Sequence, residues 1–135
     1  SKTVVRFRDY GKRRARVVLT FRLHMTFTQQ AGDEAVATLR SLVGPVRAEP
    51  GCSATRVQKG AGESAQLTWI SEWRSTEDFE QHLRAPAFRQ ILAVIELADG
   101  PPKVEIDDVN SRRGFELIEE ILGRDPADRA GLETG

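Results

Sequence analysis

The chain has 135 residues, a length that suits one domain with a core of ordinary size. Its 20 Lys and Arg residues balance its 20 Asp and Glu residues, so no overall charge draws the molecule to nucleic acid or to a membrane surface. The single cysteine, Cys52, excludes an intramolecular disulfide and fits a reducing compartment. No apolar stretch approaches the roughly 18 residues of a membrane-spanning helix. We therefore expect a cytoplasmic protein that partners neither nucleic acid nor a membrane.

Basic side chains are concentrated at the N-terminus. Residues 1–14 are predicted to form an irregular basic arm, with a short strand at residues 4–8. Such an arm would be able to touch phosphate, but it lacks a helix-turn-helix pattern and zinc-ligand spacing. A solvated terminal segment is therefore the favoured interpretation.

Alternation of apolar and polar residues predicts a long strand over residues 15–27. Two shorter strands are expected at residues 52–59 and 66–74, joined by a hairpin loop at residues 60–64. A last strand is expected at residues 103–109. Six apolar side chains share one face of the first strand: Val17, Leu19, Phe21, Leu23, Met25 and Phe27.

Helical periodicity lies between these strands. Gly32 and Asp33 are predicted to introduce a helix with an apolar stripe, and Pro45 is predicted to kink it. Pro86 fits the first turn of another helix. Residues 115–122 form a short amphipathic pattern near the C-terminus.

The element order, strand, helix, strand, strand, helix, strand, predicts an α+β fold of the ferredoxin-like split βαβ type, with a four-stranded antiparallel sheet. We expect the arm at residues 1–14, the domain at residues 15–110, and a C-terminal helix and tail at residues 111–135. Helices on one side leave the other face of the sheet bare. A homodimer that buries this face is therefore expected.

The most informative segment runs from Trp69 to Leu83. Strand alternation places Trp69 and Trp73 on one face, and Ser75 followed by Asp78 has capping-box spacing for a helix start. On that helix Phe79, His82 and Leu83 share one side. The pattern predicts an imidazole held against aromatic rings.

Three pieces of the chain, residues 42–52, 72–75 and 79–88, resemble the antibiotic biosynthesis monooxygenase family, which includes quinol monooxygenases. They contain an Arg-Ala-Glu-Pro-Gly-Cys turn, a Glu-Trp-Arg-Ser step and a His-Leu-Arg-Ala-Pro-Ala-Phe run. The resemblance implies a dimeric α+β barrel. It also implies oxidation of a phenolic or hydroquinone aromatic by O2, without metal or flavin. Many relatives have a second histidine where this chain has Ala87.

Cofactor-free oxygenation needs a base and an aromatic slot, because the substrate is itself the reductant. We predict His82 and Trp73 as catalytic residues, with His82 accepting the phenolic proton. Four further residues are predicted to bind the substrate: Trp69, Phe79, Phe88 and Arg84.

Each of these residues also has a structural interpretation. His82 fits a packing role on an inner helix face, and the two tryptophans fit ordinary core positions. The alternative function is therefore a non-catalytic dimeric module of the same fold that binds a ligand or a partner. No metal site is predicted, because the two histidines lie on separate elements without nearby thiol or carboxylate spacing.

Overall fold

A computed structural model describes residues 17–62, 65–109 and 112–123. The predicted basic arm and the strand at residues 4–8 lie outside these residues, as does most of the C-terminal tail. The elements follow one another as β1 (Leu19–Phe27), α2 (Gln29–Arg47), β2 (Cys52–Lys59), β3 (Ala65–Trp73), α3 (Thr76–Leu83), α4 (Pro86–Glu96), β4 (Lys103–Asp108), β5 (Arg112–Arg113) and α5 (Phe115–Leu122).

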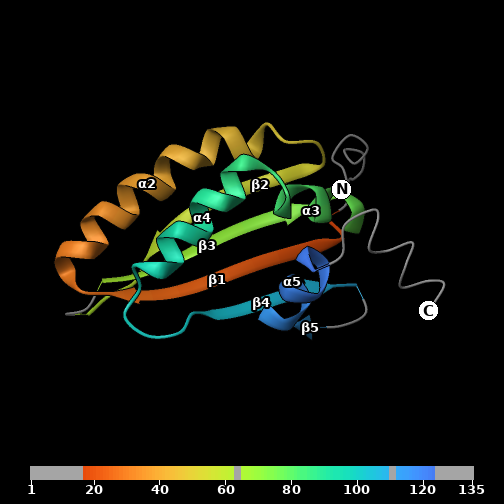
Figure 1. The fold of residues 1–135 in the computed structure, drawn as a ribbon. Coiled ribbons are helices and arrows are strands. Elements are labelled where there is room, and N and C mark those ends of the chain that lie inside the picture. The colour runs from red at the N-terminus through yellow and green to blue at the C-terminus, as the bar shows by residue number, and fades with distance from the viewer. Residues whose placement is uncertain (1–16, 63–64, 110–111, 124–135) are drawn as a thin grey trace, which may run out of the picture.

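The strands form one antiparallel sheet in the order β2-β3-β1-β4-β5, with the helices packed on one of its faces (Figure 1). The predicted α+β ferredoxin-like fold is confirmed. The sheet has a fifth strand that the sequence did not predict, because β5 is only two residues long and pairs with β4 through Ile106 and Asp107. Two residues are too few to show an alternating pattern.

The start of α2 differs from the prediction. The helix begins at Gln29, and Thr28 caps it by accepting a hydrogen bond from the Ala31 amide at 3.3 Å. Gly32 lies inside the helix, where a Cβ would collide with the Cβ of Ala65. This glycine is therefore a close-packing position between α2 and β3 and does not mark the helix start.

Pro45 does not end α2, which continues to Arg47. The proline stands in the last turn, where it removes one amide donor near the helix end. Only the start of α2 therefore differs from the prediction, and its end at Arg47 lies just before the turn at residues 49–51. Among the described residues, no helix combines the length and the apolar character needed to cross a membrane.

The core lies between the helices and one face of the sheet. The aromatic side chains in it are fully buried, and they come from β1, β3, α3 and α4. They are Phe21, Phe27, Trp69, Trp73, Phe79 and Phe88. Helix α5 contributes the buried Ile118 and Ile121 and contacts α3 and β4. We call this side of the sheet the helix face.

The opposite side of the sheet, here called the open face, carries polar and charged side chains. Arg22 forms an ion pair with Asp107 at 2.9 Å, and Arg56 lies 4.0 Å from Glu72. Arg112 on β5 extends the ion pairs to the sheet edge, with its Nε 2.6 Å from Asp107. The open face is therefore bound together by charge pairs between neighbouring strands.

Candidate active site

The corner between β3 and α3 positions the predicted site. Trp73 ends β3, and the Ser75 hydroxyl accepts a hydrogen bond from the Asp78 amide at 3.0 Å, which starts α3 as predicted. With the helix start fixed, Phe79 and His82 fall on its buried side. The predicted capping motif is thus confirmed, and it sets the direction in which the imidazole points.

His82 lies among aromatic rings. Its ring stacks on Trp73 with centroids 4.6 Å apart and an interplanar angle of 29°. Phe88 meets it edge-on at 5.4 Å, and Phe79 lies at 6.3 Å. The structure therefore brings together four of the six predicted site residues, although their roles stay predictions.

A residue that sequence reasoning missed, Glu49, contacts His82. The Glu49 carboxylate accepts a hydrogen bond from His82 Nδ1 at 2.7 Å. The His82 side chain is fully buried, whereas 16% of the Glu49 side chain is exposed. The two residues lie 33 positions apart, so no local spacing pattern joins them. The signal that was available is the Glu-Pro-Gly-Cys turn, which already belonged to the family-like motif.

The turn that carries Glu49 lies directly against α3. Gly51 in this turn has a φ of +79°, and a Cβ there would collide with the Asp78 side chain. The Gly51 carbonyl also accepts a hydrogen bond from the Arg74 amide at 2.9 Å. Backbone contact of this kind places the Glu49 carboxylate within reach of the imidazole.

The other ring nitrogen of His82, Nε2, is buried and has no hydrogen-bond partner among the described residues. Because a carboxylate only accepts hydrogen bonds, Nδ1 is the nitrogen that carries a proton toward Glu49, and in a neutral ring Nε2 is then the acceptor. Buried polar atoms in native proteins are almost always paired. A carboxylate orients the imidazole, and the other ring nitrogen is unpaired within the described part of the chain. This arrangement is expected of a general base before a proton-donating substrate binds.

The two tryptophans differ in their hydrogen bonding. Trp73 Nε1 donates to the Ser71 hydroxyl at 2.9 Å. Trp69 Nε1 is buried and unpartnered among the described residues. Trp69 stands four residues before Trp73 on the same face of β3, so the core holds a second buried nitrogen without a partner among the described residues.

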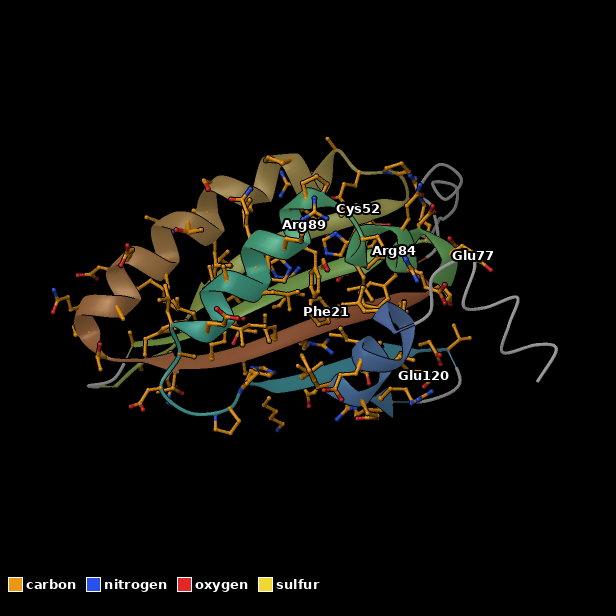
Figure 2. All side chains as sticks on the ribbon, in the orientation of Figure 1. Phe21, Cys52, Glu77, Arg84, Arg89 and Glu120 are labelled. Carbon is orange, nitrogen blue, oxygen red and sulfur yellow. The ribbon has the colours of Figure 1, made fainter. Side chains whose placement is uncertain are left out.

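Arg84, the sixth predicted site residue, contacts the C-terminal helix. Its guanidinium donates to the Ile121 carbonyl at 2.9 Å and to the Glu80 carbonyl at 3.4 Å. Figure 2 shows Arg84 beside α3, with α5 close by. The residue thereby ties the last turn of α5 to the helix that carries His82.

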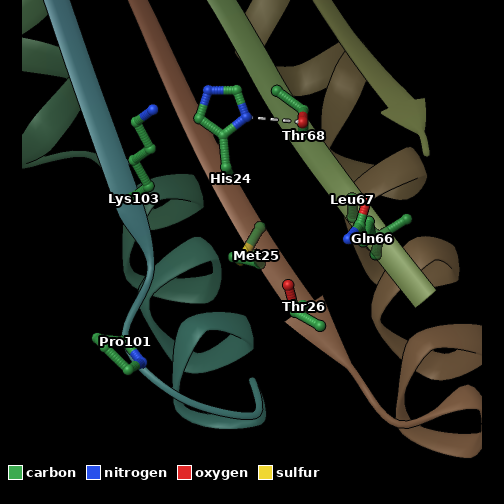
Figure 3. Close-up of a pocket in the computed structure, with 8 residues that line it drawn as sticks. All are labelled: His24, Met25, Thr26, Gln66, Leu67, Thr68, Pro101 and Lys103. Atoms are coloured by element: carbon green, nitrogen blue, oxygen red, sulfur yellow. Dashed lines mark hydrogen bonds between the residues drawn. The ribbon is translucent and has the colours of Figure 1, made fainter. Parts of the chain in front are cut away.

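The described pockets lie away from His82. One is a groove of about 330 Å³ on the open face, lined by residues of β1 and β3 together with Pro101 and Lys103 (Figure 3). In it His24 contacts the Thr68 hydroxyl and the Glu105 carboxylate, each at 3.0 Å. The other, of about 170 Å³, lies at the β2-β3 hairpin. Neither is lined by His82 or Trp73.

Cys52 is buried, as predicted, and its thiol lies 3.0 Å from the Thr55 hydroxyl. Burial raises the pKa of the Cys52 thiol, which disfavours the reactive thiolate. Within the described ranges, no three His, Cys, Asp or Glu side chains gather in a group suited to a metal ion.

A single antiparallel sheet with helices on one face, and a buried histidine in the last turn of α3, describe a small α+β domain. The model of the antibiotic biosynthesis monooxygenase family matches residues 19–94, more than half of the chain. The chain belongs to this family. The match includes Glu49, Trp73 and His82, whereas β4, β5 and α5 lie beyond it.

Solved structures with the same fold agree with this assignment. A protein from Pseudomonas aeruginosa gives a TM-score of 0.61 at 23% identity and covers 71% of this chain and 97% of its own. A Bacteroides thetaiotaomicron protein, described as a possible oxidoreductase, gives 0.62 at 17% identity, with 70% and 99% covered. A structure named antibiotic biosynthesis monooxygenase gives 0.61 at 20% identity, with 69% and 99% covered. At these identities the likeness shows the fold alone. A comparison with curated proteins finds no match.

Proposed function

We propose that the protein is a cofactor-independent monooxygenase that oxidises a small phenolic or hydroquinone aromatic with O2. One observation carries the proposal: His82 Nε2 is a buried, unpartnered acceptor on an imidazole that a carboxylate orients. Membership of the antibiotic biosynthesis monooxygenase family supports the reaction class. Buried polar atoms in native proteins are rarely left unpaired, which favours a base over a packing histidine at this position.

The chemistry begins with a proton transfer. A phenolic hydroxyl donates its proton to His82 Nε2, and the resulting phenolate is electron-rich enough to pass an electron to O2. For a substrate with a methylene group between aromatic rings, the radical pair combines to a peroxide. Such a substrate reacts as its phenolic tautomer, so the proton taken by His82 and the hydrogen left on the ring carbon together are the two methylene hydrogens. His82 returns its proton to the peroxide, and loss of water, which carries the second oxygen atom, leaves a carbonyl at that carbon.

The aromatic side chains provide the binding surface in this proposal. Trp73, which stacks on His82, and the edge-on Phe88 would hold a planar ring, and Phe79 completes the wall. Trp69 Nε1 would donate to a second substrate oxygen. Because these rings are fully buried, substrate entry requires some of them to move.

Oxygen uptake tests the proposal. Purified protein is incubated with an anthrone-type substrate or with menadiol, and the rate is compared with the spontaneous rate in buffer. We expect protein-dependent uptake, and we expect ¹⁸O from labelled O2 in the product of the anthrone-type substrate. If oxygen uptake stays at the spontaneous rate with every substrate of this class, the protein is not a monooxygenase of this type.

A second function, a non-catalytic module that binds a small aromatic ligand, is favoured by the dense aromatic packing around His82 and by Ala87 at the place of the relatives' second histidine. It predicts saturable quenching of tryptophan fluorescence by the ligand, with oxidation no faster than in buffer. Protein-dependent oxidation would contradict it.

We further propose that two copies form a homodimer through the open face. The support is the single helical layer and the opposite charges on this face, where Arg22, Asp107, Arg56 and Glu72 offer self-complementary pairs. Light scattering during size-exclusion chromatography should give twice the chain mass of 15.0 kDa. A monomeric mass at micromolar concentration would contradict it.

A further inference from the structure

We infer that Glu49 is the positioning residue of this site: it holds His82 in the tautomer that presents a lone pair at Nε2, and it stabilises the ring once that nitrogen has taken a proton. The inference rests on the proposed function for its kinetic part. Its structural part, the tautomer, stands or falls by itself.

The hydrogen bond between Glu49 and His82 favours one tautomer of the imidazole. The Glu49 oxygen and His82 Nδ1 are 2.7 Å apart, a short distance typical of a charge-assisted hydrogen bond. In water an imidazole exchanges between two neutral tautomers, but a carboxylate at one nitrogen selects the form protonated there. The lone pair is thereby fixed on Nε2, the nitrogen that faces the core without a partner.

The Glu49 carboxylate also stabilises the charge that His82 acquires when it accepts a proton. When His82 accepts a proton it becomes a cation inside a shell of Trp73, Phe79 and Phe88, which offers little solvation. A buried charge without a partner is strongly unfavourable, whereas a paired one is tolerated. The Glu49 carboxylate lies 2.7 Å from Nδ1 and supplies the negative charge that would stabilise this cation.

The Glu49 carboxylate remains in contact with solvent, which favours its charged form. Glu49 stands in the turn before β2, and 16% of its side chain is exposed, so water still reaches it. The imidazole itself is fully buried. Water therefore solvates the Glu49 carboxylate and stabilises its negative charge. The imidazole of His82, including Nε2, is shielded from water.

Two substitutions separate position from charge. Glu49→Gln keeps an oxygen that accepts from Nδ1 but removes the negative charge. Glu49→Ala removes both. Glu77→Gln is the matched control, because Glu77 is an exposed carboxylate on α3, the helix that carries His82.

Nitrogen-15 spectra of the histidine rings give the structural readout. The chain contains two histidines, so a His24→Gln variant assigns both sets of signals. We expect the neutral Nδ1–H tautomer for His82 in the wild type, in Glu49→Gln and in Glu77→Gln, and the Nε2–H tautomer in Glu49→Ala. An Nε2–H tautomer in the wild type, or an unchanged tautomer in Glu49→Ala, would overturn the inference, whether or not the protein turns over substrate.

Steady-state kinetics give the second readout. We expect kcat to fall by about 10- to 100-fold in Glu49→Gln, with little change in KM, because the substituted group acts on the protonated ring and not on the bound substrate. Glu77→Gln should keep the wild-type kcat. An unchanged kcat in Glu49→Gln would overturn the electrostatic role. Failure of the wild type to oxidise any substrate would instead count against the proposed function, and the ring spectra would still decide the tautomer.

Discussion

The two histidines of this chain lie on opposite faces of one sheet and have opposite surroundings. His24, on the open face, has both ring nitrogens engaged, by Thr68 and Glu105. His82, on the helix face, has one nitrogen held by Glu49 and the other buried without a partner. The hydrogen bonds of a histidine, and not its presence, therefore distinguish a structural imidazole from a candidate base.

Trp73→Ala should have the largest effect, on stability. The indole is fully buried, stacks on His82 and contacts Phe79, so its removal leaves a large cavity. We expect a loss of about 3 to 5 kcal/mol in the free energy of unfolding, measured by urea denaturation. Thr68→Ala, on the open face of the same strand, should cost about 1 kcal/mol or less. Equal losses would contradict the difference between the two faces.

His82→Gln tests whether the two histidines differ in their effect on activity. If His82 is the base, kcat for an anthrone-type substrate should fall by about 10²- to 10⁴-fold. The matched His24→Gln variant should stay within about threefold of the wild type, because its imidazole is engaged on the other side of the sheet. Oxygen uptake measures both variants. A larger loss in His24→Gln would reverse the assignment of roles.

Arg84→Leu probes the link between the site and the C-terminal helix. The substitution removes the hydrogen bond to the Ile121 carbonyl, so α5 should open more often. We expect the free energy of opening of α5, measured by amide hydrogen exchange, to fall by about 1 to 2 kcal/mol. The exchange of the β2 amides should not change. Unchanged exchange in α5 would show that the Arg84 hydrogen bond does not limit the opening of this helix.

The smallest predicted effect concerns pH and the open face. The hydrogen bond from His24 lowers the pKa of the Glu105 carboxyl. This interaction therefore stabilises the fold above the carboxyl's unfolded pKa of about 4.3, and the contribution is lost as pH falls through the lowered folded value. Because His24 is partly exposed and solvent screens the pair, we expect about 0.3 to 0.5 kcal/mol. Urea denaturation from pH 6 to pH 3 should show this component in the wild type and lose it in Glu105→Gln.

Local signals in the sequence predicted most of the elements. Alternation found the strands, and the Ser75 cap fixed the start of α3 to within a residue. The predicted start of α2 was wrong because a glycine next to an aspartate resembles a turn. Gly32 instead lies inside the helix, where its lack of a side chain allows close packing against Ala65. Such a close approach between a helix and a strand is a tertiary fact that no short window contains.

The site was predictable only in part, for the same reason. Face periodicity placed His82, Phe79 and Trp73 together, because they lie within one strand-helix corner. Glu49 and the partners of His24 come from distant parts of the chain, and only the sheet and the turn bring them near. The unpartnered state of Nε2 is likewise visible only once every neighbour is in place.

The tight turn at Gly51 has a consequence for recognising similar chains. Any larger residue there would collide with Asp78 and push the turn away from α3, which would lengthen the distance from Glu49 to His82. A Glu-Pro-Gly step followed by a histidine 33 positions after the glutamate is thus a compact search signature for this acid-imidazole pair. Chains that keep the histidine but replace the glycine should have lost the pairing.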